Sequence, residues 1–349
     1  MPFTTKVLIT TFLFLLLCFT PPSSSFLFSF PSNPWSPFQN LTGCNPGDYN
    51  PLLPNLKSYL HRFGYLPTPV SNFSDLFDSD LAAALLSYQR NLGLPTTGSL
   101  DAETLSVISL PRCGVPDITP NSSGRGRHLY SYFAGTPSWP SDKRVLTYAL
   151  TDTSSISIDR RTLQDVFARA FARWSAATTL NFTEVSPPDS DYADITIGFY
   201  RGDHGDGEAF DGVLGTLAHA FSPTDGRFHL DAAEAWVATG DVTAAAEENA
   251  VDLESVAVHE IGHLLGLGHS SATEAVMYPS LRTRTRKVEL MKDDIEGIQG
   301  LYGGNPNSGV ESMRRSSPET SGGVPEPAAV TVVALVATAV ASILTKFVL

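Results

Sequence analysis

The chain has 349 residues, of which 42% are hydrophobic, so it is long enough to bury one sizeable core together with smaller attachments. Its formal net charge is −13, and so acidic a chain offers no basic face for the phosphates of a nucleic acid. With only three cysteines, it cannot be a disulfide scaffold, and its core or bound metals must hold it together. Composition therefore predicts a globular protein without a nucleic-acid partner.

The N-terminus has the pattern of a secretory signal peptide. Lys6 is followed by an apolar run over residues 7–19 and then by small residues and prolines, which predicts a signal peptide over residues 1–25. Removal of the signal peptide would leave the mature chain without Cys18. Export is consistent with four glycosylation sequons, which begin at Asn40, Asn72, Asn121 and Asn181.

Residues 26–129 are expected to precede the main domain, with a small helical domain at about 50–110. Apolar residues recur there at helical spacing in two stretches, and Gly and Pro separate the helices. The stretch from Tyr88 to Leu105 resembles the peptidoglycan-binding-like three-helix fold. A helical domain without a ligand of its own is the interpretation we prefer.

The segment Pro111-Arg112-Cys113-Gly114-Val115-Pro116-Asp117 (residues 111–117, the Cys113 segment) follows. A thiolate is a strong ligand for zinc, so a cysteine on a tethered segment could fill the open position of a zinc site and displace its water. A Cys44–Cys113 disulfide is the alternative. Residues 121–128 are polar and Gly-rich with Arg125 and Arg127, as in an exposed linker that a protease can cut.

The main domain is expected over residues 130–303, with an α+β fold. The pattern predicts strands at 145–150 and 194–199, and helices at 159–178, 252–265 and 292–302. A mixed, twisted sheet packed against three helices is the expected architecture.

Two clusters of possible metal ligands lie in this domain. Of the eight histidines, only His61 and His128 fall outside residues 204–269. Three histidines and one aspartate can complete a closed tetrahedral site, which would hold a structural zinc. This first cluster consists of His204, Asp206, His219 and His229.

The second cluster is the stretch HExxHxxGxxH at residues 259–269. On a helix, His259 and His263 project from the same face, where one zinc can accept both nitrogens. Gly266 can end the helix in the left-handed conformation and let His269 return as a third ligand. Three protein ligands leave one position open, as in a catalytic zinc site, and Glu260 could act as general base on the zinc-activated water.

The C-terminal part loses this periodicity. Residues 304–327 are rich in Ser, Pro and Gly and predict a flexible stalk. Residues 328–349 form a hydrophobic tail, which is either a signal for a glycolipid (GPI) anchor or a transmembrane helix. The anchor is the preferred interpretation, and either would tether the protein to the plasma membrane with its main domain outside.

These motifs together resemble the matrix metalloproteinases, a metzincin family of zinc proteases, over roughly residues 50–303. The absence of hemopexin-like repeats makes the resemblance greatest to the plant members. It implies a metzincin catalytic domain preceded by a small all-α propeptide domain, and a zymogen silenced by Cys113 as an inhibitory zinc ligand. In the family, residues matching Arg112 and Asp117 pair to fix that loop. The new amino terminus near Tyr130 would pair with Asp293 or Asp294.

The resemblance also implies further site residues. Met277 would form the methionine turn beneath the catalytic zinc, and the first cluster would hold the structural zinc. At least one calcium ion would be bound by the side chains and backbone oxygens of Asp211, Gly212, Leu214, Thr216, Asp231 and Glu234.

The resemblance also implies that the substrate lies between two chain segments. Leu217–Ala220 would pair with an extended peptide, and Pro279–Leu281 would border the pocket for the residue after the scissile bond. Ser255 falls at the floor of this pocket, where a small residue suggests depth. The loop 222–228 is shorter than in vertebrate members, which puts a second calcium site at Asp194 in doubt. Leu281 replaces the tyrosine that is usual in the family.

We therefore expect a secreted, monomeric zinc endopeptidase that acts on extended protein or peptide substrates at the extracellular face of the plasma membrane. The competing hypothesis is a catalytically inert cell-wall protein that binds through its peptidoglycan-binding-like domain. An inert scaffold should have lost Glu260, which is present. A membrane-tethered adhesion protein is not supported by any repeat or ligand motif.

Overall fold

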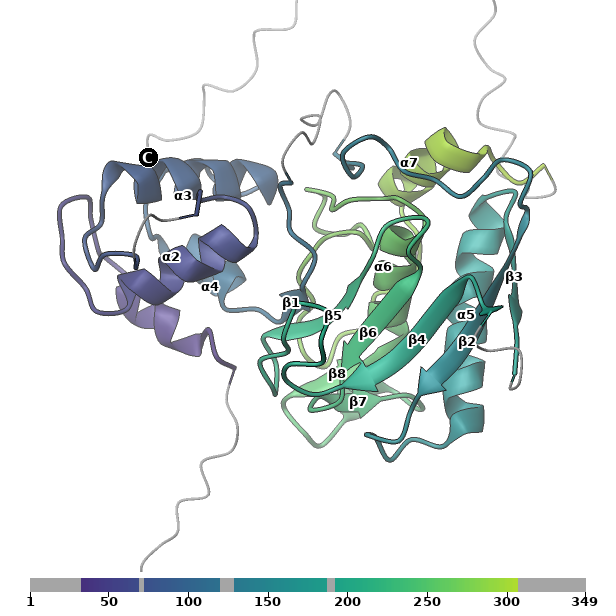
Figure 1. The fold of residues 1–349 in the computed structure, drawn as a ribbon. Coiled ribbons are helices and arrows are strands. Elements are labelled where there is room, and N and C mark those ends of the chain that lie inside the picture. The colour runs from purple at the N-terminus through teal and green to yellow at the C-terminus, as the bar shows by residue number, and fades with distance from the viewer. Residues whose placement is uncertain (1–32, 69–71, 120–128, 187–191, 307–349) are drawn as a thin grey trace, which may run out of the picture. The chain divides into compact units, whose positions relative to one another are not determined.

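A computed structural model describes residues 33–68, 72–119, 129–186 and 192–306 (Figure 1). The expected signal peptide, the linker with Arg125 and Arg127, the sequon at Asn121 and the hydrophobic tail lie outside these residues, as does all of the stalk beyond residue 306. Within the described ranges, no helix combines the length and the apolar character that a bilayer span requires.

The N-terminal part is helical, as its spacing predicts. It contains the 3-10 helix η1 (Ser36–Leu41) and the helices α2 (Leu53–Arg62), α3 (Ser79–Asn91) and α4 (Ala102–Ile108). Asp78 and Asp101 begin α3 and α4, since their side chains accept backbone N–H groups of the first turn. The predicted apolar residues form one buried cluster, which includes Leu56, Tyr59, Leu60, Phe63, Leu81, Leu85, Tyr88 and Leu92.

The main domain is built on a mixed six-stranded sheet with the order β1-β5-β6-β4-β2-β3. The pair β5–β6 is antiparallel and the other neighbours are parallel. One edge strand, β1 (Arg112–Cys113), comes from the Cys113 segment. The remaining strands of the sheet are β2 (Val145–Asp152), β3 (Asn181–Glu184), β4 (Ile195–Tyr200), β5 (Thr216–Ala220) and β6 (Arg227–Asp231).

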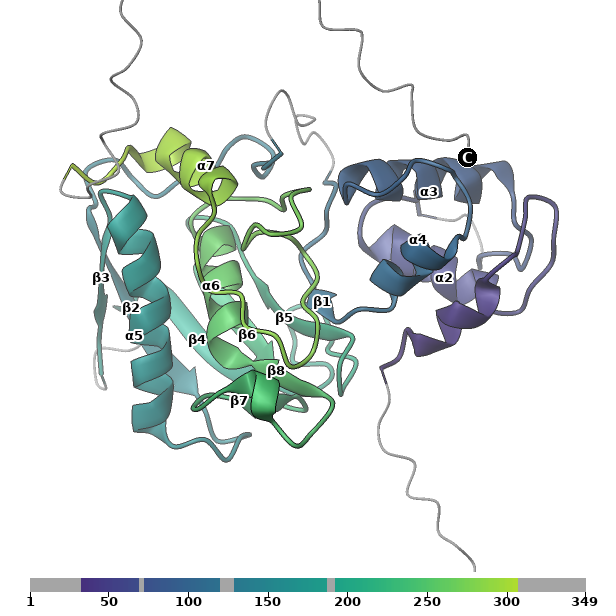
Figure 2. The same cartoon turned by 180° about the vertical axis from the view of Figure 1, so that it is seen from behind.

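Helices α5 (Arg160–Ala177) and α6 (Leu253–Leu264) cover one face of this sheet, as the two opposite views show (Figures 1 and 2). The apolar face of α5 ends in Trp174, whose indole N–H donates to the Val258 carbonyl of α6 at 2.9 Å. The helix α7 (Lys292–Tyr302) closes the domain. A short sheet of β7 (Ala235–Val237) and β8 (Ala250–Asp252), with the 3-10 helix η3 (Val242–Ala244), precedes α6. The predicted α+β class is confirmed.

The turn that contains Met277 packs directly against α6. A Cβ atom added at Gly262 would lie 2.3 Å from the Met277 sulfur, so a larger residue there would force the Met277 side chain to move. The buried Asp294 of α7 accepts the backbone N–H groups of Val276 and Met277 at 2.9 and 3.0 Å. The first turn of α7 therefore holds the Met277 turn in place against α6.

Replacement of Asp294 by alanine should destabilise the fold through this turn. Asp294→Ala leaves two buried N–H groups without an acceptor, at roughly 1–3 kcal/mol each, so the free energy of unfolding should fall by about 3 kcal/mol. Urea unfolding of the full chain measures this. Glu296→Ala, which removes one exposed ion pair with Lys292, is the matched control and should change it by less than about 0.5 kcal/mol. Equal effects of both substitutions would contradict the assignment.

Candidate functional site

Three histidines on α6 and directly after it converge on one point. His259 and His263 lie one turn apart on α6, and Gly266 adopts a φ of 101° that turns the chain back so that His269 joins them. The Nε2 atom of His263 lies 3.2 Å from that of His259 and 3.1 Å from that of His269. Nitrogens that surround one zinc tetrahedrally are separated by about 3.3 Å, so this donor set fits zinc.

The outer ring nitrogens are held by other groups. Nδ1 of His259 lies 2.7 Å from the Val276 carbonyl oxygen, and Nδ1 of His263 lies 2.8 Å from that of Leu267. Burial lowers the pKa of both His259 and His263 well below the usual value. Both rings are therefore neutral and direct an Nε2 lone pair inward, as metal ligands require.

Cys113 adds a sulfur to the same point. Its Sγ atom lies 3.4 Å from Nε2 of His263, and the ligand atoms of Cys113 and the three histidines all lie within 4.8 Å of one another. Burial raises the pKa of the Cys113 thiol well above its usual value, and the nearby Glu260 raises it further. Both Cys113 and Cys44 are free, so the disulfide alternative is wrong.

A buried ion pair braces the Cys113 segment. The Arg112 guanidinium lies 2.6 Å from Oδ1 of Asp117, and neither side chain is exposed to solvent. The same guanidinium lies 3.6 Å from the centre of the ring of Phe63, the residue that follows α2. Oδ1 of Asp117 also lies 2.7 Å from Nδ1 of His269, a contact that the sequence did not predict.

The Cys113 segment lies between β5 and the segment 279–281 and bonds to both. On the β5 side, Arg112 N–H donates to the Gly215 carbonyl and Gly114 N–H to the Ala218 carbonyl, each at 2.8 Å. On the other side, Cys113 N–H donates to the Pro279 carbonyl at 2.9 Å. These are the hydrogen bonds of an extended strand held between two edges.

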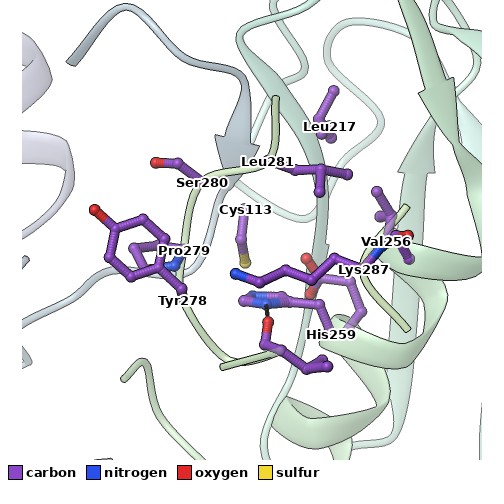
Figure 3. A pocket seen from close by; sticks show the side chains of 12 residues that line it. Cys113, Leu217, Val256, His259, Tyr278, Pro279, Ser280, Leu281 and Lys287 are labelled. Carbon is purple, nitrogen blue, oxygen red and sulfur yellow. Dashed lines mark hydrogen bonds between the residues drawn. The ribbon is translucent and has the colours of Figure 1, made fainter. Parts of the chain in front are cut away.

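A pocket opens beside this point (Figure 3). Glu260 lines it and is 1% exposed, and no N–H or O–H group of the described residues donates to its carboxylate oxygens. Burial raises the pKa of Glu260 to about 8, while the Cys113 thiol acts in the opposite direction. Ser255 and Leu281 line the pocket as expected, and so does Lys287, which the sequence did not indicate.

The first cluster also converges. Oδ2 of Asp206 lies 2.9 Å from Nε2 of His204, 2.7 Å from Nε2 of His219 and 2.7 Å from Nδ1 of His229. Burial lowers the pKa of His219 to about 4 and also lowers that of His229. Although burial acts against it, hydrogen bonds from the Glu208 N–H and from His219 hold the pKa of Asp206 low. One carboxylate and neutral imidazoles at these spacings fit a closed zinc site.

Two of the expected calcium ligands, Asp231 and Glu234, are buried carboxylates. Burial raises the pKa of Asp231 to about 6 and that of Glu234 to about 8, and each is raised further by the neighbouring acids. Both Glu234 oxygens are buried without a hydrogen-bond donor from the part of the chain that is described. Backbone N–H groups of Thr216 and Gly212 bond to Asp211 and Asp231. Carboxylate and carbonyl oxygens are the ligands that calcium prefers in proteins.

Two other aspartates have protein partners. Asp293 accepts the Tyr130 N–H at 3.2 Å and the Ser270 hydroxyl at 2.6 Å, so of the two expected candidates it is Asp293 that lies at Tyr130. Asp194 is paired with Lys143 and also accepts the N–H and hydroxyl of Thr147. Its oxygens are therefore already engaged at the expected position of a second calcium.

Comparison with known proteins gives two family matches. Residues 138–303 match the family described as matrixin, a peptidase family, and residues 50–108 match the peptidoglycan binding domain. The chain is 53% identical over 293 residues to metalloendoproteinase 2-MMP of Arabidopsis thaliana, covering 78% of this chain and 76% of that protein. It is 46% identical to metalloendoproteinase 1 of Glycine max, with 76% and 86% covered. It is 40% identical to matrilysin of Rattus norvegicus, with 71% and 84% covered.

We propose that each histidine cluster holds one zinc, and the two sites can be separated by substitution. The full chain should contain two zinc ions, and Asp206→Ala should contain one, because Asp206 touches all three histidines of its cluster. Metal analysis after dialysis measures the content. The control Asp203→Ala changes an exposed neighbour that bonds only locally to Gly205 and should retain two. Two zinc ions in Asp206→Ala would exclude this site.

Proposed function

Because this chain belongs to the matrixin family and is a zinc metalloendopeptidase, we propose that it is made as a zymogen in which Cys113 blocks the catalytic metal. The main observation that supports this proposal is that the Cys113 sulfur lies 3.4 Å from His263 Nε2, within the group of three histidines. Removal of the Cys113 segment would open that position to water and to a peptide. The domain limits 26–129 for the propeptide and 130–303 for the enzyme remain part of this proposal.

His259, His263 and His269 would hold the catalytic zinc. When bound, zinc lowers the pKa of a water molecule to around 7 and polarises the peptide carbonyl. The neutral, carbonyl-anchored imidazoles fix its position, and the Met277 turn supports the helix that carries two of them. Asp206 and its three histidines would hold the structural zinc, and Asp211, Asp231 and Glu234 a calcium, with backbone oxygens of Gly212, Leu214 and Thr216.

Glu260 would act as the general base and then as the general acid. It follows His259 directly, is buried and lines the pocket, so its carboxylate can take a proton from the attacking water and hand it to the leaving amine. Among the described residues, no N–H or O–H group donates a hydrogen bond to its carboxylate oxygens, so both can accept one from water or substrate. A buried carboxylate with a raised pKa is suited to proton transfer near neutral pH.

The substrate would be an extended peptide that replaces the Cys113 segment. The carbonyls of Gly215, Ala218 and Pro279 now accept N–H groups of that segment. A peptide in extended conformation presents the same groups, so it could add as a strand between β5 and the segment 279–281. The Cys113 segment thus excludes substrate as well as water.

We further propose export and attachment to the plasma membrane. The support is the signal-like stretch at residues 1–25, the stalk at 304–327 and the apolar tail at 328–349, which suits a GPI anchor. The sequon asparagines Asn40, Asn72 and Asn181 are all exposed, as glycosylation requires.

A test of the proposed function uses the full chain with zinc and calcium. It should not cleave a peptide with leucine after the scissile bond until a mercurial reagent modifies the Cys113 thiol. Glu260→Ala should keep two zinc ions yet lose roughly 10²–10⁴-fold in kcat/KM after the same treatment. Cys44→Ser serves as the control for the other thiol and should activate normally. Full activity of Glu260→Ala would contradict the role of Glu260 as the general base.

A further inference from the structure

Lys287 places a positive charge in the pocket beside the active helix. It lies on the segment between Leu281 and α7 and lines the same pocket as Leu217, Val256 and His259. In Figure 3 its side chain extends across the pocket between Leu281 and His259. The rest of the lining is mainly apolar, so this ammonium is the feature that distinguishes the pocket chemically.

The backbone around Lys287 is held by the N-terminal end of α6. Lys287 N–H donates to the Ser255 hydroxyl at 2.7 Å. The neighbouring Arg286 guanidinium bonds to Asp252 at 3.0 Å and to the buried Glu254 at 2.7 Å. Ser255 therefore not only forms the pocket floor but also fixes the point from which the Lys287 side chain enters.

The Lys287 ammonium group has hydrogen-bond donors that the protein does not use. Its Nζ atom donates to the Thr273 carbonyl at 2.7 Å and lies 5.2 Å from the centre of the Tyr278 ring. No carboxylate forms an ion pair with it in the described parts of the chain. An ammonium has three donors, so two remain for a ligand.

We propose that Lys287 is a specificity-determining residue that favours glutamate directly after the scissile bond. The glutamate stem would pack along the apolar wall, and its carboxylate would accept a charge-assisted hydrogen bond from Nζ. Leucine at the same position would cover the ammonium and leave its two remaining donors without an acceptor, which costs free energy. This inference rests on the proposed function, since it assigns the pocket to the residue after the scissile bond.

The test compares peptides that differ only at that residue, cleaved by the mercurial-treated full chain. Glutamate and glutamine have the same shape, so their kcat/KM ratio isolates the charge. In the wild type the Glu/Gln ratio should exceed one. In Lys287→Met, which keeps the stem and removes the charge, it should fall at least about tenfold, whereas Lys287→Arg should retain a ratio above one.

Two results would overturn the inference: faster cleavage of the glutamine peptide by the wild type, or the same ratio in wild type and Lys287→Met. If Lys287→Met does not fold, the Glu/Gln ratio of the wild type alone decides the test. A leucine peptide distinguishes a failure of the Lys287 inference from a failure of the proposed function. Cleavage of the leucine peptide with no preference for glutamate refutes only the role of Lys287, while cleavage of no peptide refutes the proposed function as well.

Discussion

The convergence of three imidazoles, with Nε2 of one ring 3.2 and 3.1 Å from Nε2 of the other two, is the constraint on which the rest of the structure depends. His259 and His263 require an intact helix, and His269 requires that this helix end at Gly266, whose φ of 101° suits glycine. The carbonyl oxygens of Val276 and Leu267 then orient two of the rings. Trp174, Met277 and Asp294 hold the surrounding elements in place.

The Cys113 segment satisfies the same constraint from outside the main domain. Its sulfur approaches the three histidines, while its backbone bonds to β5 and to Pro279. Arg112 is buried against Phe63 and Asp117, and Asp117 reaches His269. One short stretch therefore links the helical domain, β5 and the three histidines, so the proposed inhibition by Cys113 would depend on the packing of the helical domain.

Much of this could be predicted from sequence because the periodicities are local. The HExxHxxGxxH spacing predicts the places of His259 and His263 through helix geometry and that of His269 through the turn at Gly266, and the apolar stripe of α5 predicts its buried face. The position of Lys287 could not be predicted, because it depends on the hydrogen bond that its N–H donates to Ser255 and on the bonds of Arg286 to residues more than thirty positions away. The contact of Asp117 with His269, and the choice of Asp293 over Asp294 at Tyr130, also depend on tertiary packing.

The most direct test of the central claim is the absorption spectrum of the full chain with cobalt in place of zinc. A thiolate-to-cobalt charge-transfer band should be present in the wild type and in Cys44→Ser, and absent in Cys113→Ser. The first cluster contains no sulfur, so cobalt bound there cannot produce the band. A wild-type spectrum without it, at full cobalt loading, would contradict the assignment of Cys113 as the fourth ligand.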